Sequence, residues 1–181
     1  MRSDSRRNRD RVLDAALEVL TVDPDAAIED VAAAAGVTRS TVYRRFAGRD
    51  QLLAAVQVRL IEETRALFLE AVAGEPDHRR CMAVLLPDAV RQVHQRRWLW
   101  QRLTEMHALD DYRPQGAFVD WLAAGQRAGA FRDDVPVAWL MTVWMQLVFG
   151  GSVVVERNGI LIDEAAAMAL DAAERAFAPR P

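Results

Sequence analysis

Apolar residues recur at helical spacing along almost the whole chain, and no run alternates apolar and polar residues for long enough to predict a β-strand. The first apolar stripe lies on a helix predicted over residues 5–20 and consists of Val12, Leu13, Ala16, Leu17 and Leu20. Pro, Gly and capping residues divide the rest of the chain into pieces of helical length. The pattern therefore predicts an all-α protein of about nine helices.

The predicted helices form an N-terminal group and a larger body. The first group continues with helices over residues 28–35, 39–46 and 50–73. The body is predicted to contain helices over residues 78–97 with a kink at Pro87, over 98–108, from Pro114 to Gly129, over 136–156 and over 163–178. We accordingly expect a head over residues 1–49 and a helical body over residues 50–181.

The segment around residues 36–46 has the pattern of a tight turn followed by a short helix. Gly36 allows the positive φ angle that such a turn often needs. Thr38 is a suitable N-cap, because its hydroxyl can accept from the N–H groups of Ser40 or Thr41. Val37 and Val42 have the spacing of a hydrophobic staple, and Phe46 follows Val42 on the same face. This face is expected to pack on the first two helices.

The opposite face of that short helix is polar and free of carboxylates from residue 38 to residue 49. Rotation of about 100° per residue directs Ser40 and Arg44 outward, with Thr41 and Tyr43 beside them and Arg39 and Arg45 nearer the edges. Arg can bind guanine edges or phosphate, and hydroxyl groups suit phosphate. A helix, a glycine turn and a second helix with such a face indicate a helix-turn-helix DNA-binding motif. The alternative is an ordinary helix pair whose basic face is merely solvated.

The net charge of the chain is −3, so a DNA-binding surface would have to come from local clusters of positive charge. The first fifty residues contain nine Arg and nine acidic residues, with the Arg gathered in residues 1–12 and 38–49. All 23 basic residues are Arg, which excludes lysine-dependent catalysis. A single Cys and three His suggest neither a disulfide nor a zinc site, and no cofactor or metal is expected. An enzyme is a minor alternative, and a cytoplasmic location is expected because the N-terminus lacks a signal peptide pattern.

The stretch IEDVAAAAGVTRSTVYRRFAGRDQLLAAV, residues 28–56, resembles the DNA-binding head of TetR-family regulators. The resemblance covers about residues 12–56 and rests on V-A-A-A-A-G-V-T, T-V-Y-x-x-F and R-D-x-L-L. It implies that residues 38–46, from Thr38 on, form the recognition helix and that Tyr43 contacts a phosphate. It also implies that Arg39, Ser40, Thr41 and Arg44 face the groove, and that Arg49 touches the DNA backbone.

Three features depart from the family pattern. Arg45 stands where the family often has His, and the loop over residues 21–27 is shorter than usual. Ala27 stands where a Ser or Thr cap is common, so the start of the second helix is expected to lack a side-chain cap.

Residues 135–155 carry no charge, so a membrane-spanning helix is one alternative. Pro136 and the pair Gly150-Gly151 interrupt the run, which favours a buried helix in a soluble protein. The last predicted helix offers it a face of small residues. Two such helices from each of two subunits would form a homodimer, as the resemblance also implies, through Trp144, Val148, Ala166, Ala169, Ala173 and Phe177.

The middle helices could hold a small hydrophobic effector, as the resemblance implies. The candidate lining is Met82, Leu86, Val90, Trp98, Phe118 and Trp121, and plain core packing is the alternative. His94 and His107 are possible polar anchors or simply hydrogen-bonded histidines. The sequence thus predicts a transcription regulator, a repressor that an effector releases from a near-palindromic DNA operator. The alternative is a DNA-binding adaptor that responds to a protein partner.

Overall fold

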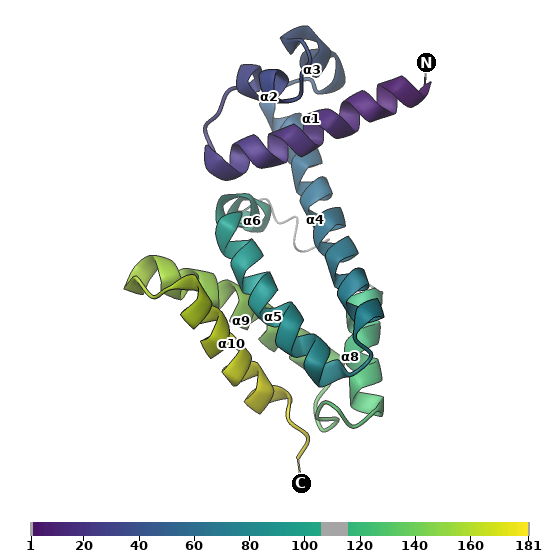
Figure 1. The fold of residues 1–181 in the computed structure, drawn as a ribbon, viewed down its shortest axis with the longest axis vertical. Helices are drawn as coiled ribbons and strands as arrows, with labels where there is room; N and C mark the ends of the chain where they lie inside the picture. The colour runs from purple at the N-terminus through teal and green to yellow at the C-terminus, as the bar shows by residue number, and fades with distance from the viewer. Residues whose placement is uncertain (1, 106–115, 181) are drawn as a thin grey trace. The chain divides into compact units, whose positions relative to one another are not determined.

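The computed structural model describes residues 2–105 and 116–180, and within these ranges the chain forms nine helices and no strand (Figure 1). The helices are α1 (Arg2–Val22), α2 (Ile28–Ala34), α3 (Arg39–Arg45), α4 (Arg49–Gly74), α5 (His78–Gln95), α6 (Arg97–Glu105), α8 (Ala117–Arg127), α9 (Val137–Asn158) and α10 (Ile162–Phe177). The all-α prediction is confirmed.

Most predicted helix ends lie within two residues of the observed ones. The first helix begins three residues earlier than predicted, and α3 ends at Arg45 because Phe46 is extended, with φ −131°. Pro87 lies inside α5, which continues to Gln95. The predicted helix start at Pro114, the end of the helix predicted to reach residue 108, and His107 lie outside the described residues.

Contacts divide the chain into two compact units. Unit 1 consists of Met1–Arg65 with Trp98–Leu103, and unit 2 of Ala66–Arg97 with Thr104–Pro181. In unit 1 the apolar stripe of α1 is buried, as are Val42 and Phe46, so both faces predicted to point inward do so. Burial of these apolar side chains away from water stabilises unit 1.

The turn between α2 and α3 ends α2 with a Schellman motif. Gly36 has φ +64°, the N–H of Val37 donates to the carbonyl of Ala32 at 2.9 Å, and the N–H of Gly36 donates to Ala33 at 3.1 Å. The guanidinium of Arg11 donates to the carbonyl of Ala35 at 2.7 Å. The turn therefore needs glycine, and α1 supplies a side chain that satisfies the end of α2.

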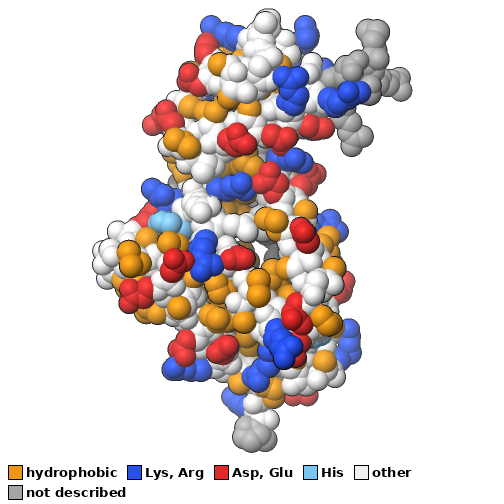
Figure 2. All heavy atoms as spheres, in the orientation of Figure 1, with side chains coloured by type: hydrophobic (Ala, Val, Ile, Leu, Met, Phe, Trp, Pro, Cys, Tyr) orange, Lys and Arg blue, Asp and Glu red, His pale blue; other side chains and the backbone are white. Residues whose placement is uncertain are grey.

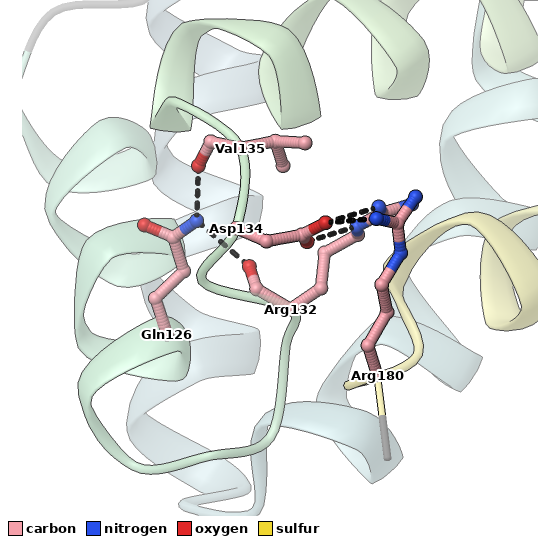
Figure 3. A network of polar contacts seen from close by, with 5 residues as sticks. All are labelled: Gln126, Arg132, Asp134, Val135 and Arg180. Carbon is pink, nitrogen blue, oxygen red and sulfur yellow. Dashed lines mark hydrogen bonds and ion pairs between the residues drawn. The ribbon is translucent and has the colours of Figure 1, made fainter.

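Unit 2 is built on α5, α9 and α10, which pack against one another, with α8 against α9. A polar network closes the loop between α8 and α9 (Figure 3). The amide of Gln126 donates to the carbonyls of Arg132 and Val135 at 2.8 and 2.9 Å. Asp134 accepts two hydrogen bonds from Arg132 at 2.7 Å and pairs with Arg180 at 2.9 Å, which ties this loop to the segment after α10.

The six residues predicted for a dimer interface are buried within unit 2 of a single chain. Their exposed fractions range from 0% to 6% within a single chain, for Trp144, Val148, Ala166, Ala169, Ala173 and Phe177. Within one chain the ring of Trp144 contacts those of Phe118 and Trp121 on α8, and the ring of Phe177 contacts that of Phe131.

Other residues make the outward surface of α9 and α10. Trp139 is 40% exposed, Val153 43%, Leu161 74% and Met168 53%. Figure 2 shows apolar side chains scattered among charged ones on the visible face of this unit. Among the described residues α9 is the one helix long and apolar enough to cross a membrane, with a mean hydropathy of 1.6. This is weak support for a span, since the interior helix of a soluble protein has the same composition.

Candidate nucleic-acid interface

The helix α3 starts at the predicted cap. Thr38 has extended backbone angles, and its hydroxyl oxygen accepts from the N–H of Thr41 at 3.3 Å. The same hydroxyl lies 3.0 Å from the hydroxyl of Ser40 and 2.9 Å from that of Thr41. Thr38, Ser40 and Thr41 thus form a small hydroxyl cluster at the start of the helix, which fixes its first turn.

The outward face of α3 is the one predicted from helical rotation. Arg39, Ser40, Tyr43 and Arg44 are exposed, and Tyr43 exposes 42% of its surface although it is aromatic. Thr41 and Arg45 are half-buried, at the edges of the face. An exposed tyrosine beside exposed arginines is available for contact with phosphate and base edges.

Arg39 is held by two partners from different elements. Its Nε lies 2.8 Å from a carboxylate oxygen of Glu29 on α2. Its guanidinium carbon lies 5.2 Å from the centre of the Tyr43 ring, one turn along α3, and an Nη lies 3.5 Å from the Tyr43 hydroxyl. The hydrogen bond to Tyr43 and the charge of Glu29 both raise the pKa of Arg39. Glu29 was not predicted as part of this site, because pairing between two helices has no local sequence signal.

Arg49, the first residue of α4, turns back toward the loop between α1 and α2. Its guanidinium donates to the main-chain carbonyls of Ala26 and Pro24. It was predicted to touch the DNA backbone, and its position gives it a structural role as well. The Nε of Arg45 is buried without a hydrogen-bond partner among the described residues, so burial anchors the stem of this side chain.

The start of α2 is capped from inside the helix. Ala27 has no side-chain acceptor, as predicted, but its own N–H donates to the carboxylate of Asp30 at 2.9 Å. This is one half of a capping box. An acid three residues after the cap was the available signal, since that is the spacing of the motif.

The proposed effector lining is only partly brought together. Met82, Leu86, Val90 and Trp121 are buried in unit 2, and Phe118 is half-buried. Phe118 and Trp121 lie nearly parallel, with centroids 5.8 Å apart. Trp98 is half-buried on α6 and belongs to unit 1.

An aromatic cluster surrounds Trp121, and only part of it was predicted from the sequence. The ring of His78 stacks on Trp121 at 5.7 Å, and further rings approach it at 5.3 to 6.2 Å, namely Phe68, Phe131 and Trp144. His94 lies apart from this cluster, with its Nδ1 3.3 Å from the hydroxyl of the buried Ser152. In the described part of the chain no three His, Cys, Asp or Glu residues are placed to hold a metal ion.

Comparison with known proteins agrees with this geometry. Residues 12–56 match the family model described as bacterial regulatory proteins, tetR family. The HTH-type transcriptional repressor LfrR of Mycolicibacterium smegmatis is 54% identical over 50 residues, which are 28% of this chain and 26% of the repressor. The matched segment thus spans about a quarter of this curated relative.

Solved structures share the fold over almost the whole length. LfrR from Mycobacterium smegmatis in complex with proflavine has a TM-score of 0.70 and 24% identity, and the match covers 95% of this chain and 97% of that one. FadR from Bacillus subtilis in complex with stearoyl-CoA has a TM-score of 0.67 and 14% identity, over 93% and 99%.

The protein is thus an all-α helix-turn-helix protein. Residues 12–56 are similar to the DNA-binding domain of the tetR family of bacterial regulatory proteins, and the whole chain shares its fold with TetR-like regulators of known structure.

Proposed function

We propose that the chain is a sequence-specific DNA-binding transcription regulator, a repressor that a small hydrophobic effector releases from its operator. The head over residues 1–49 would bind DNA, and the body over residues 50–181 would bind the effector and dimerise. The outward face of α3 carries this proposal, since it places Tyr43 and Arg44 exposed beside a capped first turn. Relatives that share the head or the fold are transcription regulators rather than enzymes, which supports a regulatory role in the cytoplasm.

The apolar surface of α9 that its own chain leaves exposed supports a homodimer. Only 28% of its most apolar stretch is buried within one chain, although the helix carries few charges. Exposed apolar side chains in water favour association with a matching surface. A two-fold dimer would present two copies of α3 to successive major grooves about 34–36 Å apart, which suits a near-palindromic operator.

The aromatic cluster around Trp121 and the ligands of two relatives support the existence of an effector site. LfrR was solved with proflavine and FadR with stearoyl-CoA, both of which carry large apolar parts. Half-buried Phe118 and Phe68 stand at the edge of the cluster, where a planar or aliphatic group could reach them. The second candidate, a DNA-binding adaptor that answers to a protein partner, would need no such opening.

Selection of bound duplexes from random DNA tests the DNA-binding function. We expect recovery of a near-palindromic sequence, with affinity that falls steeply as salt is raised, because Arg–phosphate contacts release counterions. Tyr43→Ala and Arg44→Ala should abolish tight binding and leave helicity unchanged. Arg127→Ala, an exposed arginine of unit 2, is the matched control and should bind as the parent does. Unchanged affinity of both α3 variants would refute the assignment.

Separate measurements test the dimer and the effector. Sedimentation should give a dimer at micromolar concentration, and Met168→Glu should shift it toward monomer. Proflavine and stearoyl-CoA are the first probes, with quenching of tryptophan emission as the signal and release of the selected duplex as the functional outcome. If DNA binding is tight but no member of a broad metabolite set releases it, the adaptor is the better account.

A further inference from the structure

Glu29 and Arg39 form an ion pair beside the surface that would face DNA. The Nε of Arg39 lies 2.8 Å from the carboxylate, and both side chains remain accessible, at 62% for Arg39 and 48% for Glu29. The pair joins α2 to the first residue of α3. Water and a phosphate group can therefore reach the same guanidinium that Glu29 holds.

The nitrogen atoms of the Arg39 guanidinium have different partners. The Nε–H is directed to Glu29, and one Nη approaches the Tyr43 hydroxyl at 3.5 Å. The guanidinium carbon also lies over the Tyr43 ring, 5.2 Å from its centre. An Arg fixed at Nε can move less than a free one, and its charge is partly neutralised by the carboxylate. Among the described residues no such partner holds the side chain of Arg44, which is also exposed on this face.

On the basis of the proposed DNA-binding function, we propose that Glu29 is a specificity-determining positioning residue. Its carboxylate holds Arg39 against Tyr43 and keeps this cation from binding phosphate at arbitrary sequences. A phosphate contact carries no sequence information, so withholding one weakens non-specific binding more than operator binding. Glu29 thereby widens the difference in affinity between the operator and other DNA.

Glu29→Gln tests this, because it keeps the size and polarity of the side chain and removes the charge. We expect the variant to bind a scrambled duplex about two- to fivefold more tightly at low salt, since an exposed ion pair has a modest strength. The slope of log affinity against log salt should steepen by about 0.9, the value for one additional phosphate contact. The ratio of affinities for the selected duplex and the scrambled duplex should fall. A purely structural role would not change the salt slope.

Asp30→Asn is the matched control, because it removes the same charge one residue away. Its amide oxygen can still accept from the N–H of Ala27, so the start of α2 is preserved. Arg39→Gln gives the second control. In that background Glu29→Gln should change binding no more than Asp30→Asn does, because the cation that Glu29 holds is absent.

The outcomes separate the inference from the function on which it rests. If the parent protein does not distinguish any selected duplex from a scrambled one, the proposed DNA-binding function fails. If the parent distinguishes them and Glu29→Gln equals Asp30→Asn in both salt slope and discrimination, a general charge effect explains the data and the positioning role is overturned. If Glu29→Gln acts equally with and without Arg39, the ion pair is not the cause and the inference is likewise overturned.

Discussion

The guanidinium of Arg49 lies 2.6 Å from the main-chain carbonyl oxygen of Pro24, across 25 residues of sequence. It also donates to the carbonyl of Ala26, so one side chain at the start of α4 satisfies two acceptors in the loop between α1 and α2. This loop is short and contains Pro24, and the neighbouring carbonyls of Asp23 and Ala27 accept from main-chain N–H groups. Arg49 therefore fixes the position of α2, and with it the turn that carries α3.

We expect Arg49→Ala to lower the free energy of unfolding by about 2 kcal/mol, because hydrogen bonds from a charged donor are among the stronger ones. Arg49→Lys should recover little of the loss, since a single ammonium cannot reproduce the planar fork. Urea unfolding followed by circular dichroism measures this. Arg44→Ala, an exposed position, should leave stability within about 0.5 kcal/mol. Loss of DNA binding by Arg49→Ala without loss of stability would show that Arg49 acts at the DNA instead.

A second prediction concerns Ala27, the N-cap of α2. Asp30 already accepts from the Ala27 N–H, and only the reverse bond is missing. Ala27→Ser should complete the capping box and raise the free energy of unfolding by about 1 kcal/mol. Ala33→Ser, an exposed position within the same helix, is the control and should be neutral or slightly destabilising. Equal effects at both positions would mean that the hydroxyl acts through solvation rather than through capping.

The periodicity of apolar residues was sufficient to predict the helices and the orientation of α3. Val42 and Phe46 point inward because any amphipathic helix on an apolar support must turn that way. The contacts of Arg49 with Pro24 and of Arg39 with Glu29 could not be predicted, since they join segments whose distance depends on the fold. Periodicity also could not identify the residues of a dimer interface, for a related reason. Ala166 and Ala173 form a small-residue stripe, and a stripe does not reveal whether its partner is the same chain or another.

A third prediction concerns pH and the network at Asp134. Hydrogen bonds from Arg132, with the charge of Arg180 in addition, lower the pKa of Asp134 in the folded protein. A lowered folded pKa means that the ionised carboxylate stabilises the fold above its ordinary range, near pH 4, and that this contribution is lost as the pH falls through the lowered value. Asp134→Asn should therefore lower Tm at pH 7 and have less effect toward pH 3.

Thermal unfolding between pH 3 and pH 8 measures this difference. Asp133→Asn removes the same charge from the neighbouring position and is the matched control. A deficit of Asp134→Asn that stays constant across the pH range would indicate lost packing or hydrogen bonding by the amide rather than lost charge.

The last prediction uses two adjacent glycines in α9. A Cβ added at Gly151 would lie 2.8 Å from Cγ1 of Val90 on α5, whereas a Cβ added at Gly150 would meet nothing within 4 Å. Val90 is fully buried and β-branched, so it cannot turn away without disturbing its neighbours. Gly151→Ala should lower the free energy of unfolding by about 1–3 kcal/mol. Gly150→Ala should raise it by up to about 1 kcal/mol, because alanine favours the helix.

Urea unfolding at several protein concentrations distinguishes packing within the chain from packing between subunits, since only the latter depends on concentration. A concentration-dependent loss for Gly150→Ala would place Gly150 against a second subunit. Combining Gly151→Ala with Val90→Ala should cost less than the sum of the two changes, because the shorter side chain leaves room for the new methyl group. Additive losses would contradict a direct contact between Gly151 and Val90. They would instead point to a wider rearrangement where α5 meets α9, and so to a more adaptable core beside the residues that we propose for the effector.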